Sequence, residues 1–305
     1  MRSRTGKKRT QTPRSVNSAQ KTTSHAPRAA GPKPPQGGLF LWGRHAVLAA
    51  LANPERRIAA LYVSSDAAKQ ISEAIAALPG QRQRDLPPPH PTDRARLDAI
   101  RPAGDSQKPE QGKAIHQGMV AAVWPLESPD LADFLAGFPT NTDDEEAGDS
   151  ALPRPRLRLL LLDQLSDPRN VGAIMRTALA LGASAIITTH RNAPDETGVL
   201  ARAAAGALES IPMIKVVNLA RAIETLQQAD ITVVGLAGEG DAAVEELGNV
   251  ERLALVLGAE GTGLRHLTRQ HCDRLVRIDI DPKSESLNVS IAAAIALYAA
   301  GQMRG

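Results

Sequence analysis

Apolar runs of strand length recur along the second half of the chain, separated by stretches with helical periodicity. Continuous apolar runs without polar alternation are typical of strands that are buried on both faces of a sheet. The runs are Leu159–Leu162, Ala185–Thr189, Ile211–Val217, Ile231–Leu236, Leu253–Leu257 and Leu275–Ile278. Because helical segments alternate with them, the pattern predicts an α/β domain over residues 156–305, with a mostly parallel sheet covered on both faces.

A smaller α/β unit is predicted over residues 39–124. Strand-like and helical patterns alternate in it, with a helix at Gly43–Leu51, a strand at Ile58–Val63, a helix at Asp66–Ala77 and a closing strand at Gly118–Val123. Residues 125–155 contain several prolines and an acidic cluster at 143–149, so we interpret them as a linker. Consecutive carboxylates without a turn glycine seldom converge on one ion, and we expect no metal site there.

The net charge of +3 is unevenly distributed. Residues 1–38 carry nine basic and no acidic side chains, whereas residues 39–305 carry 27 basic and 33 acidic ones. The first segment is rich in Ser, Thr, Pro and Gly and poor in bulky apolar residues, which predicts a disordered arm. A basic arm favours nucleic acid, because each cation near a phosphate releases counterions. A solubilising leader or an organellar transit peptide would have the same composition.

Several classes of protein are excluded by composition. Aromatic residues make up only 2% of the chain, too few for an RNA-binding sheet built on stacked rings. The single cysteine, Cys272, can form neither an internal disulfide nor a thiolate metal site. The sequence has no apolar run as long as a membrane span and no apolar signal segment at its start. We therefore expect a cytoplasmic protein without a membrane segment.

The candidate chemistry lies in three loops that follow predicted strands, where ligands of open α/β sheets bind. The first loop, residues 163–172, contains Asn170 and leads into a helix at Ala173–Leu181 that carries Arg176. An amide and a guanidinium near a helix N-terminus favour an anion such as phosphate. Alternatively, Asn170 only caps the helix and Arg176 only pairs with an acid. The residues expected to face the sheet are Ile174, Leu179 and Leu181.

The second loop, residues 258–264, reads Gly-Ala-Glu-Gly-Thr-Gly-Leu. Glycines between a strand and a helix let a ligand approach the backbone closely. Their spacing is the reverse of the dinucleotide fingerprint and no Walker lysine follows, which counts against a nicotinamide enzyme. The same spacing recurs at Gly235–Gly240, which we interpret as a simple turn.

The third loop, residues 279–290, contains Ser286 and Asn288 and precedes an apolar, alanine-rich helix at Ile291–Ala300. Taken alone, both polar residues are interpreted equally well as N-caps of that helix. The joint occurrence and the order of the three loops carry more information than any one of them.

Together the loops resemble motifs 1, 2 and 3 of the SpoU (TrmH-like) branch of the SPOUT RNA methyltransferases. The first contributes an Asn-x-Gly-x-x-x-Arg pattern, the second Gly-x-Glu-Gly-x-Gly-Leu and the third Ser-Leu-Asn-Val-Ser. Two further segments, Gly43–Val47 and His116–Gly118, resemble the small L30e-like substrate domain of the RlmB group, which methylates guanosine of 23S rRNA. The resemblance covers residues 39–305 and leaves out only the basic arm.

This resemblance implies a SPOUT domain with a deep trefoil knot, a homodimer, and S-adenosylmethionine held by the knotted loops. The donor would be bound by Gly258, Ile278 and Leu287, and the polar part of the site would be formed by Asn170, Arg176, Glu260, Ser286 and Asn288. The implied reaction is methyl transfer to a ribose 2′-hydroxyl of RNA. Because a guanidinium stays protonated in proteins, we expect Arg176 to hold a phosphate or a developing alkoxide rather than to act as a simple base.

The chain departs from the family in the third loop, where Ile280–Lys283 replaces a common Pro-Met pair. This change affects the expected shape of the donor pocket. Outside the three loops, His45 is either an RNA contact or a structural residue near a helix start. The main hypothesis is a 2′-O-methyltransferase acting on a guanosine of 23S rRNA. The alternatives are a tRNA-directed enzyme and a non-catalytic RNA-binding assembly factor of the same fold.

Overall fold

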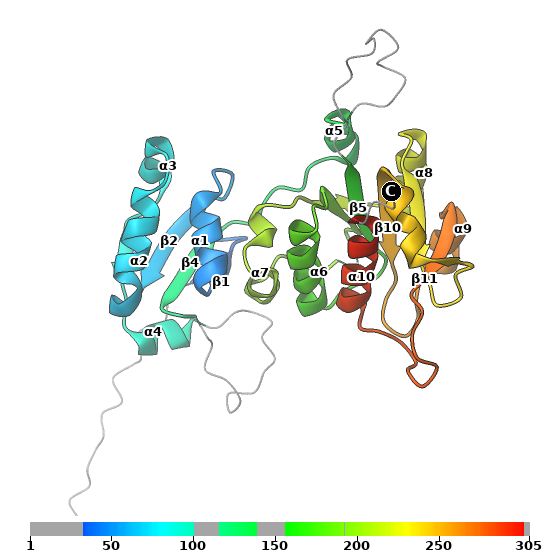
Figure 1. The fold of residues 1–305 in the computed structure, drawn as a ribbon. Helices are drawn as coiled ribbons and strands as arrows, with labels where there is room; N and C mark the ends of the chain where they lie inside the picture. Colours follow the sequence, from blue (N-terminus) through cyan, green and yellow to red (C-terminus); the bar gives the residue numbers. More distant parts are fainter. Residues whose placement is uncertain (1–32, 101–115, 139–155, 192, 302–305) are drawn as a thin grey trace, which may run out of the picture. The chain divides into compact units, whose positions relative to one another are not determined.

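The computed structural model describes residues 33–100, 116–138, 156–191 and 193–301. Most of the predicted basic arm and the acidic cluster at 143–149 lie outside the described residues. Two sheets with their helices make up the described part (Figure 1). Within it, no helix is both long enough and apolar enough to cross a membrane.

The first sheet has four strands in the order β1-β4-β2-β3. β4 pairs antiparallel with both β1 and β2, and β3 pairs parallel with β2. The strands are β1 (Leu39–Trp42), β2 (Ile58–Val63), β3 (Pro89–Pro91) and β4 (Met119–Val123), and the helices are α1 (Arg44–Ala52), α2 (Ser65–Ala76), α3 (Gly80–Asp85) and α4 (Arg94–Ala99). The four elements predicted for this unit are confirmed. The added elements have three to six residues, too few to display a period.

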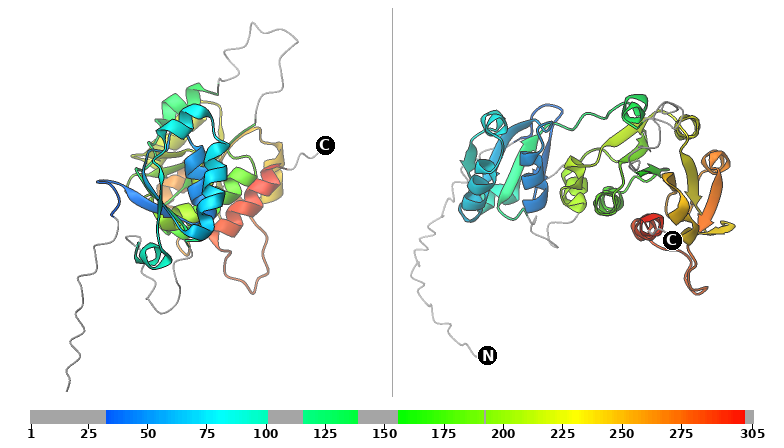
Figure 2. Two further views of the ribbon diagram at one scale, coloured as in Figure 1. Left: turned by 90° about the vertical axis from the view of Figure 1, so that its left-hand side faces the viewer. Right: turned by 45° about the horizontal axis from the view of Figure 1, so that its top comes forward.

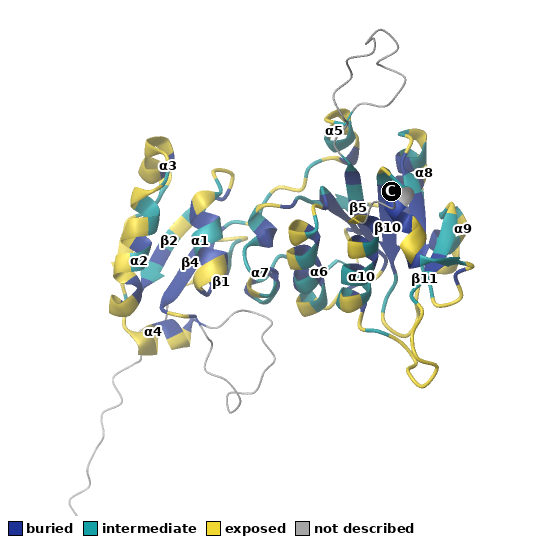
Figure 3. Ribbon diagram, viewed as in Figure 1, coloured by how far each residue is buried: buried dark blue, intermediate teal, exposed yellow. Residues whose placement is uncertain are grey.

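The second sheet has seven strands in the order β7-β6-β5-β10-β8-β11-β9, and every pair in it is parallel. Its strands are β5 (Leu157–Leu162), β6 (Ala185–Thr189), β7 (Met213–Val216), β8 (Thr232–Leu236), β9 (Ala242–Ala243), β10 (Arg252–Leu257) and β11 (Arg274–Arg277). The predicted parallel sheet is confirmed, with the short edge strand β9 added. Figure 3 shows the central strands in the colour of buried residues.

Helices cover both faces of this sheet, as Figure 2 shows. The helices in this part of the chain are α5 (Leu131–Ala136), α6 (Pro168–Ala180), α7 (Gly198–Ala204), α8 (Leu219–Gln228), α9 (His266–His271) and α10 (Val289–Gly301), with the 3-10 helices η2 (Ala207–Glu209) and η3 (Val244–Asn249). Alternate residues of β5 enter two cores: Leu160 and Leu162 pack on the side of α6 and α10, and Leu159 and Leu161 on the side of α8. Apart from Arg158, the strand is therefore apolar.

One expectation about these elements is wrong, and one element is added. The segment interpreted as a linker contains helix α5 in its described part, because Leu131, Phe134 and Phe138 pack on the core beside α8. In α6, Leu179 does not face the sheet but is 42% exposed. The buried stripe runs through Ile174 and Ala178, four residues apart, and the next residue is turned away from it.

A buried charged cluster is formed by Arg56, Glu196 and Glu209, whose side chains are 0%, 7% and 3% exposed. The Arg56 guanidinium donates to Glu209 from Nη2 (2.7 Å) and Nε (3.0 and 3.1 Å), and to Glu196 from Nη1. Asn53 donates to Glu209 (2.9 Å), and the Leu126 amide donates to Glu196 (3.0 Å). Burial raises the pKa of Glu196, although Arg56 and the Leu126 amide oppose the shift.

Candidate active site

The three predicted loops meet at the carboxyl ends of β5 and β10, which are neighbours in the sheet. Asn170 lies in the first turn of α6, Glu260 in the loop after β10, and Asn288 directly before α10. Their side chains form one hydrogen-bonded cluster. Glu260 is 90 positions and Asn288 is 118 positions from Asn170 in the sequence, and the fold brings both into contact with it.

A single carboxylate oxygen is the centre of this cluster. Glu260 Oε1 accepts from Asn170 Nδ2 (3.0 Å), from Asn288 Nδ2 (2.7 Å) and from the Val289 amide (3.5 Å). Asn288 Nδ2 also donates to Asn170 Oδ1 (3.1 Å). Hydrogen bonds to an ionised acceptor are stronger than neutral ones, so Glu260 joins the three loops at their exposed ends.

Helix capping accounts for only part of these contacts. The N-cap of α6 is Asp167, which accepts from the Arg169 amide (2.9 Å), so the interpretation of Asn170 as that helix's cap is wrong. Asn288 does act as a cap, because its Oδ1 accepts from the Ser290 amide (3.0 Å) and hydroxyl (2.6 Å). Its amide nitrogen remains available for Glu260.

Arg176 is exposed on α6 and makes no hydrogen bond or ion pair with another described residue. The alternative in which it only pairs with a nearby acid therefore finds no partner in the described part of the chain. The structure leaves its guanidinium outside the Asn170–Glu260–Asn288 cluster and open to solvent.

The loop 258–264 folds back on itself, as its glycines require. A Cβ at Gly258 would lie 2.2 Å from the Gly263 carbonyl carbon, so no other residue fits there without a shift. The Gly263 amide donates to the Ala259 carbonyl (2.9 Å), and Gly263 has a φ of 67°, in the region that favours glycine. Gly258 is partly buried at the base of this closed turn.

The remaining predicted residues lie in the third loop or at its start. Ile278 is half-buried and packs against the main core, and Leu287 is half-buried as well. Ser286 is exposed, and only its carbonyl is contacted, by the Ser284 hydroxyl (3.3 Å). The structure therefore does not join the Ser286 hydroxyl to the cluster.

The repeated glycine pattern at Gly235–Gly240 ends in a turn, as predicted, in which the Gly240 amide donates to the Ala237 carbonyl (3.0 Å). Because β8 lies between β10 and β11, this turn lies between the second and third loops. That position depends on the order of strands in the sheet, which the spacing of the glycines does not reveal.

Asp163, the first residue after β5, is a further residue of this region that the sequence patterns did not predict. Its side chain is 0% exposed and accepts from Arg265, at the end of the glycine loop. A polar residue directly after an apolar strand is the only signal that singles it out. Buried carboxylates in proteins are generally paired, as this one is.

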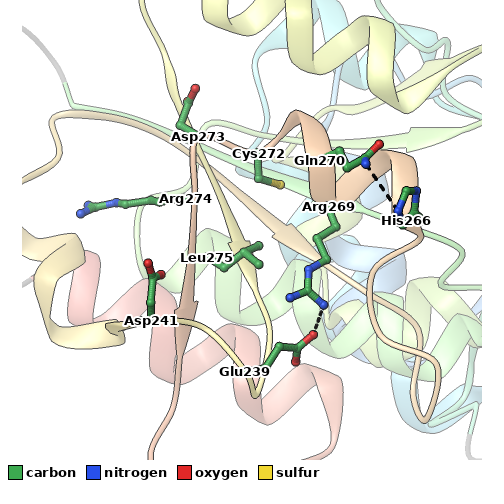
Figure 4. Close-up of a pocket in the computed structure, with 9 residues that line it drawn as sticks. All are labelled: Glu239, Asp241, His266, Arg269, Gln270, Cys272, Asp273, Arg274 and Leu275. Atoms are coloured by element: carbon green, nitrogen blue, oxygen red, sulfur yellow. Dashed lines mark hydrogen bonds and ion pairs between the residues drawn. The ribbon is translucent and has the colours of Figure 1, made fainter.

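A pocket of about 650 Å³ lies near α9, lined by Arg269, Glu239, Cys272 and others, and Arg269 and Glu239 form an ion pair across it (Figure 4). None of the predicted site residues lines it. Burial, with the nearby Asp273 and Asp163, raises the pKa of Cys272 to about 12. The thiol is therefore protonated at neutral pH and unsuited to nucleophilic catalysis. The described residues contain no cluster of His, Cys, Asp or Glu that could hold a metal ion.

Comparison with known protein sequences points to one family. The model of the SpoU rRNA methylase family matches residues 158–298. The 23S rRNA (guanosine-2′-O-)-methyltransferase RlmB of Escherichia coli K12 is 40% identical over 194 residues, which cover 63% of this chain and 73% of that protein. The RlmB of Pseudomonas putida KT2440 is 34% identical over 267 residues, 87% of this chain and 96% of the relative.

Solved structures share the fold. The SpoU methyltransferase AviRb from Streptomyces viridochromogenes, in complex with AdoMet, superposes with a TM-score of 0.64 at 21% identity and covers 87% of this chain and 90% of that one. An AdoMet-bound rRNA methyltransferase from Sinorhizobium meliloti gives a TM-score of 0.63 at 21% identity, with 87% of each chain covered. With relatives of this identity matched over most of their length, the chain belongs to the SpoU rRNA methylase family.

Proposed function

We propose that this protein transfers the methyl group of S-adenosylmethionine to the ribose 2′-hydroxyl of a guanosine in 23S rRNA. The chain is an RNA 2′-O-methyltransferase, and its RlmB relatives carry that substrate in their names. The observation that carries the proposal is the shared acceptor Glu260 Oε1, which joins Asn170 and Asn288 at the carboxyl ends of the sheet. A purely structural protein has no need of such a polar cluster at an exposed strand end.

The residues around the glycine loop fit S-adenosylmethionine. Ile278 and Leu287 offer half-buried apolar surface for an adenine, and Gly258 offers backbone groups at the base of the turn. Space around Gly263 is open, because a Cβ there would meet no atom within 4 Å. When bound, the donor supplies a methyl group activated by its sulfonium sulfur.

Arg176 acts on the RNA side of the reaction. Its exposed guanidinium stays charged, so it binds the phosphate next to the target ribose and stabilises negative charge that develops on the 2′-oxygen. Asn170, Glu260 and Asn288 keep the three loops in register around the donor. Ser286, exposed beside Leu287, completes the polar part of the site.

The active form in this proposal is a homodimer formed through α6 and α10, which pack against each other. Ile291 and Tyr298, one heptad apart on α10, are 52% and 60% exposed, and Leu179 on α6 is 42% exposed. Large apolar side chains gathered on adjacent helices are typical of an interface. A second copy of the chain covers this face.

The four-stranded unit serves as the RNA-binding domain, with an L30e-like fold. Its two motif segments meet, since Gln117 Oε1 accepts from the Arg44 amide (2.8 Å) and the Gly43 amide donates to the Met119 carbonyl (3.2 Å). Arg44 and His45 then face RNA from one corner of the unit. The trefoil knot and a cytoplasmic location belong to the same proposal.

The test is to incubate the purified protein with radiolabelled S-adenosylmethionine and separate pools of unmodified rRNA and tRNA, and to identify the labelled nucleoside after digestion. We expect 2′-O-methylguanosine from rRNA. Label in tRNA alone would mean that the substrate is tRNA rather than rRNA. If the protein labelled neither pool and also failed to bind the donor, the result would favour a non-catalytic RNA-binding protein.

A further inference from the structure

We infer that Asp163 is a positioning residue that holds the glycine loop 258–264 closed through Arg265. The inference rests on the proposed function only in its second step, which concerns donor binding. Its first step, the anchoring of the loop, follows from contacts among described residues.

Asp163 bonds to the residues on both sides of the loop. Its amide donates to the Leu257 carbonyl (2.8 Å), directly before Gly258. Its Oδ2 accepts from the Arg265 amide (3.0 Å), and its Oδ1 accepts from Arg265 Nε (2.6 Å). The residue directly after β5 thus fixes the two ends of a loop that begins almost a hundred positions later in the chain.

Besides Asp163 and Arg265, the loop is held at Glu260, by the contacts with Asn170 and Asn288. Its described internal contact is the bridge between Ala259 and Gly263, and glycines allow it many backbone conformations. Glu260 lies inside this loop, so the place of Glu260 Oε1 relative to Asn170 depends on where the loop ends are held. Asp163 therefore acts on the polar cluster without touching it.

A carboxylate suits this position better than any other side chain. Both oxygens of Asp163 are occupied by donors of Arg265, and the side chain is fully buried. An amide in the same place has one acceptor, and its NH2 group would face an N–H of Arg265. Two buried N–H donors that face each other lose their hydrogen bonds and gain none from water. The free-energy cost of these lost bonds favours an open loop.

The experiment compares Asp163→Asn with Asp167→Asn in the full-length protein. Both variants remove one negative charge from the same short segment. Asp167 is exposed and caps α6, and asparagine is as good an N-cap as aspartate, so this control keeps its structural role. Three quantities are measured: amide hydrogen exchange of residues 257–265, the Kd for S-adenosylmethionine by calorimetry, and the thermal midpoint.

For Asp163→Asn we expect faster exchange confined to residues 257–265 and a Kd raised about ten-fold. The control should match the wild type in both. Arg265→Lys keeps the charge and the backbone donor but lacks the Nε–H that Asp163 Oδ1 accepts, so an intermediate change is expected. This variant changes a side chain that is 43% exposed, and it carries the test if Asp163→Asn does not fold.

If amide exchange of residues 257–265 were unchanged in both Asp163→Asn and Arg265→Lys, the inference would be overturned. Faster exchange spread over the whole parallel sheet would also overturn it, because Asp163 would then stabilise the domain in general. If the wild type itself bound no S-adenosylmethionine, the proposed function would fail, whereas the exchange comparison would still decide whether Asp163 anchors the loop.

Discussion

Arg176 makes no hydrogen bond or ion pair with another described residue, yet the proposed function assigns it the stabilisation of charge on the 2′-oxygen. We predict that Arg176→Ala lowers the rate of methyl transfer at least about 10²-fold, the effect of removing one group that stabilises developing charge. Donor binding should be unchanged, since Arg176 makes no hydrogen bond or ion pair with any described residue of the loops that hold the donor. Initial rates with labelled donor and the Kd from calorimetry measure the two quantities.

The matched control is Arg221→Ala, which removes another exposed helix arginine, on α8. Its turnover should equal that of the wild type. Equal losses in both variants would mean that general positive charge, rather than the position of Arg176, promotes the reaction.

Cys272 offers a second test at the same scale. Because its pKa is raised to about 12, the thiolate fraction at pH 8 is very small. The greater nucleophilicity of a high-pKa thiolate offsets part of this loss. We predict alkylation by iodoacetamide roughly 10²-fold slower than that of free cysteine at pH 8. Mass spectrometry of the intact protein follows it directly, since the chain has one cysteine. Reaction at the free-cysteine rate would contradict the buried environment.

At the scale of elements, the residue directly before α10 has two roles. Asn288 caps the helix through Oδ1 and contacts Glu260 through Nδ2. Asn288→Ala should therefore lower the free energy of unfolding by about 1 kcal/mol and reduce methyl transfer. Asn288→Ser retains a capping oxygen, so it should restore stability but not activity. Urea denaturation and turnover of the two variants separate the tasks, and restored turnover in the serine variant would contradict the role of the Glu260 contact.

Elements whose pattern is continuous could be predicted closely. β6 occupies the predicted range, Ala185–Thr189, because each of its residues is buried. β9 has only two alanines and α5 only six residues, so neither displays a period. Their existence depends on neighbours that are distant in sequence: β9 pairs with β11, and α5 packs on the core beside α8.

The candidate site was predictable to the level of loops. Strand ends and the order of motifs placed Asn170, Glu260 and Asn288 at one edge of the sheet. Which oxygen they share, and which residue caps α6, depend on side-chain directions that spacing does not determine. Asp163 was missed for the same reason, because its partner Arg265 is 102 positions away.

At the scale of the molecule, the cluster of Arg56, Glu196 and Glu209 links stability to pH. A carboxyl group whose pKa is raised on folding contributes stability below its unfolded pKa, and this contribution is lost as the pH rises through the folded pKa. Glu196 is such a group, with an ordinary value of 4.5. Glu196→Gln does not titrate, so the wild type should lose stability relative to this variant as the pH rises above about 4.5.

Urea denaturation of both proteins between pH 4.5 and pH 8 measures this difference in unfolding free energy. The comparison cancels the titration of all groups that the two proteins share. A difference that stays constant with pH, or that changes in the opposite direction, would refute the assignment to Glu196.

The proposed dimer leads to a second prediction at the scale of the whole molecule. Tyr298→Glu should convert the protein to a monomer, because it places a charge in the apolar face of α10. Leu267→Glu is the control, since Leu267 on α9 is 62% exposed, close to the 60% of Tyr298, but lies outside that face. Sedimentation equilibrium of the two variants decides the question. A monomeric wild type, or a monomeric control, would refute the interface.

The pairing of β5 with β10 also determines how the protein reaches its native state. Their register joins Leu157 to Arg252 and Leu162 to Leu257. Such distant parallel contacts form slowly, because a long loop must close before any contact is gained. Until then, a strand with five leucines and one arginine presents an open edge, which other chains can extend. The yield of folded protein therefore depends on how quickly that edge is covered, and lower temperature or a chaperone that shields it should raise the yield.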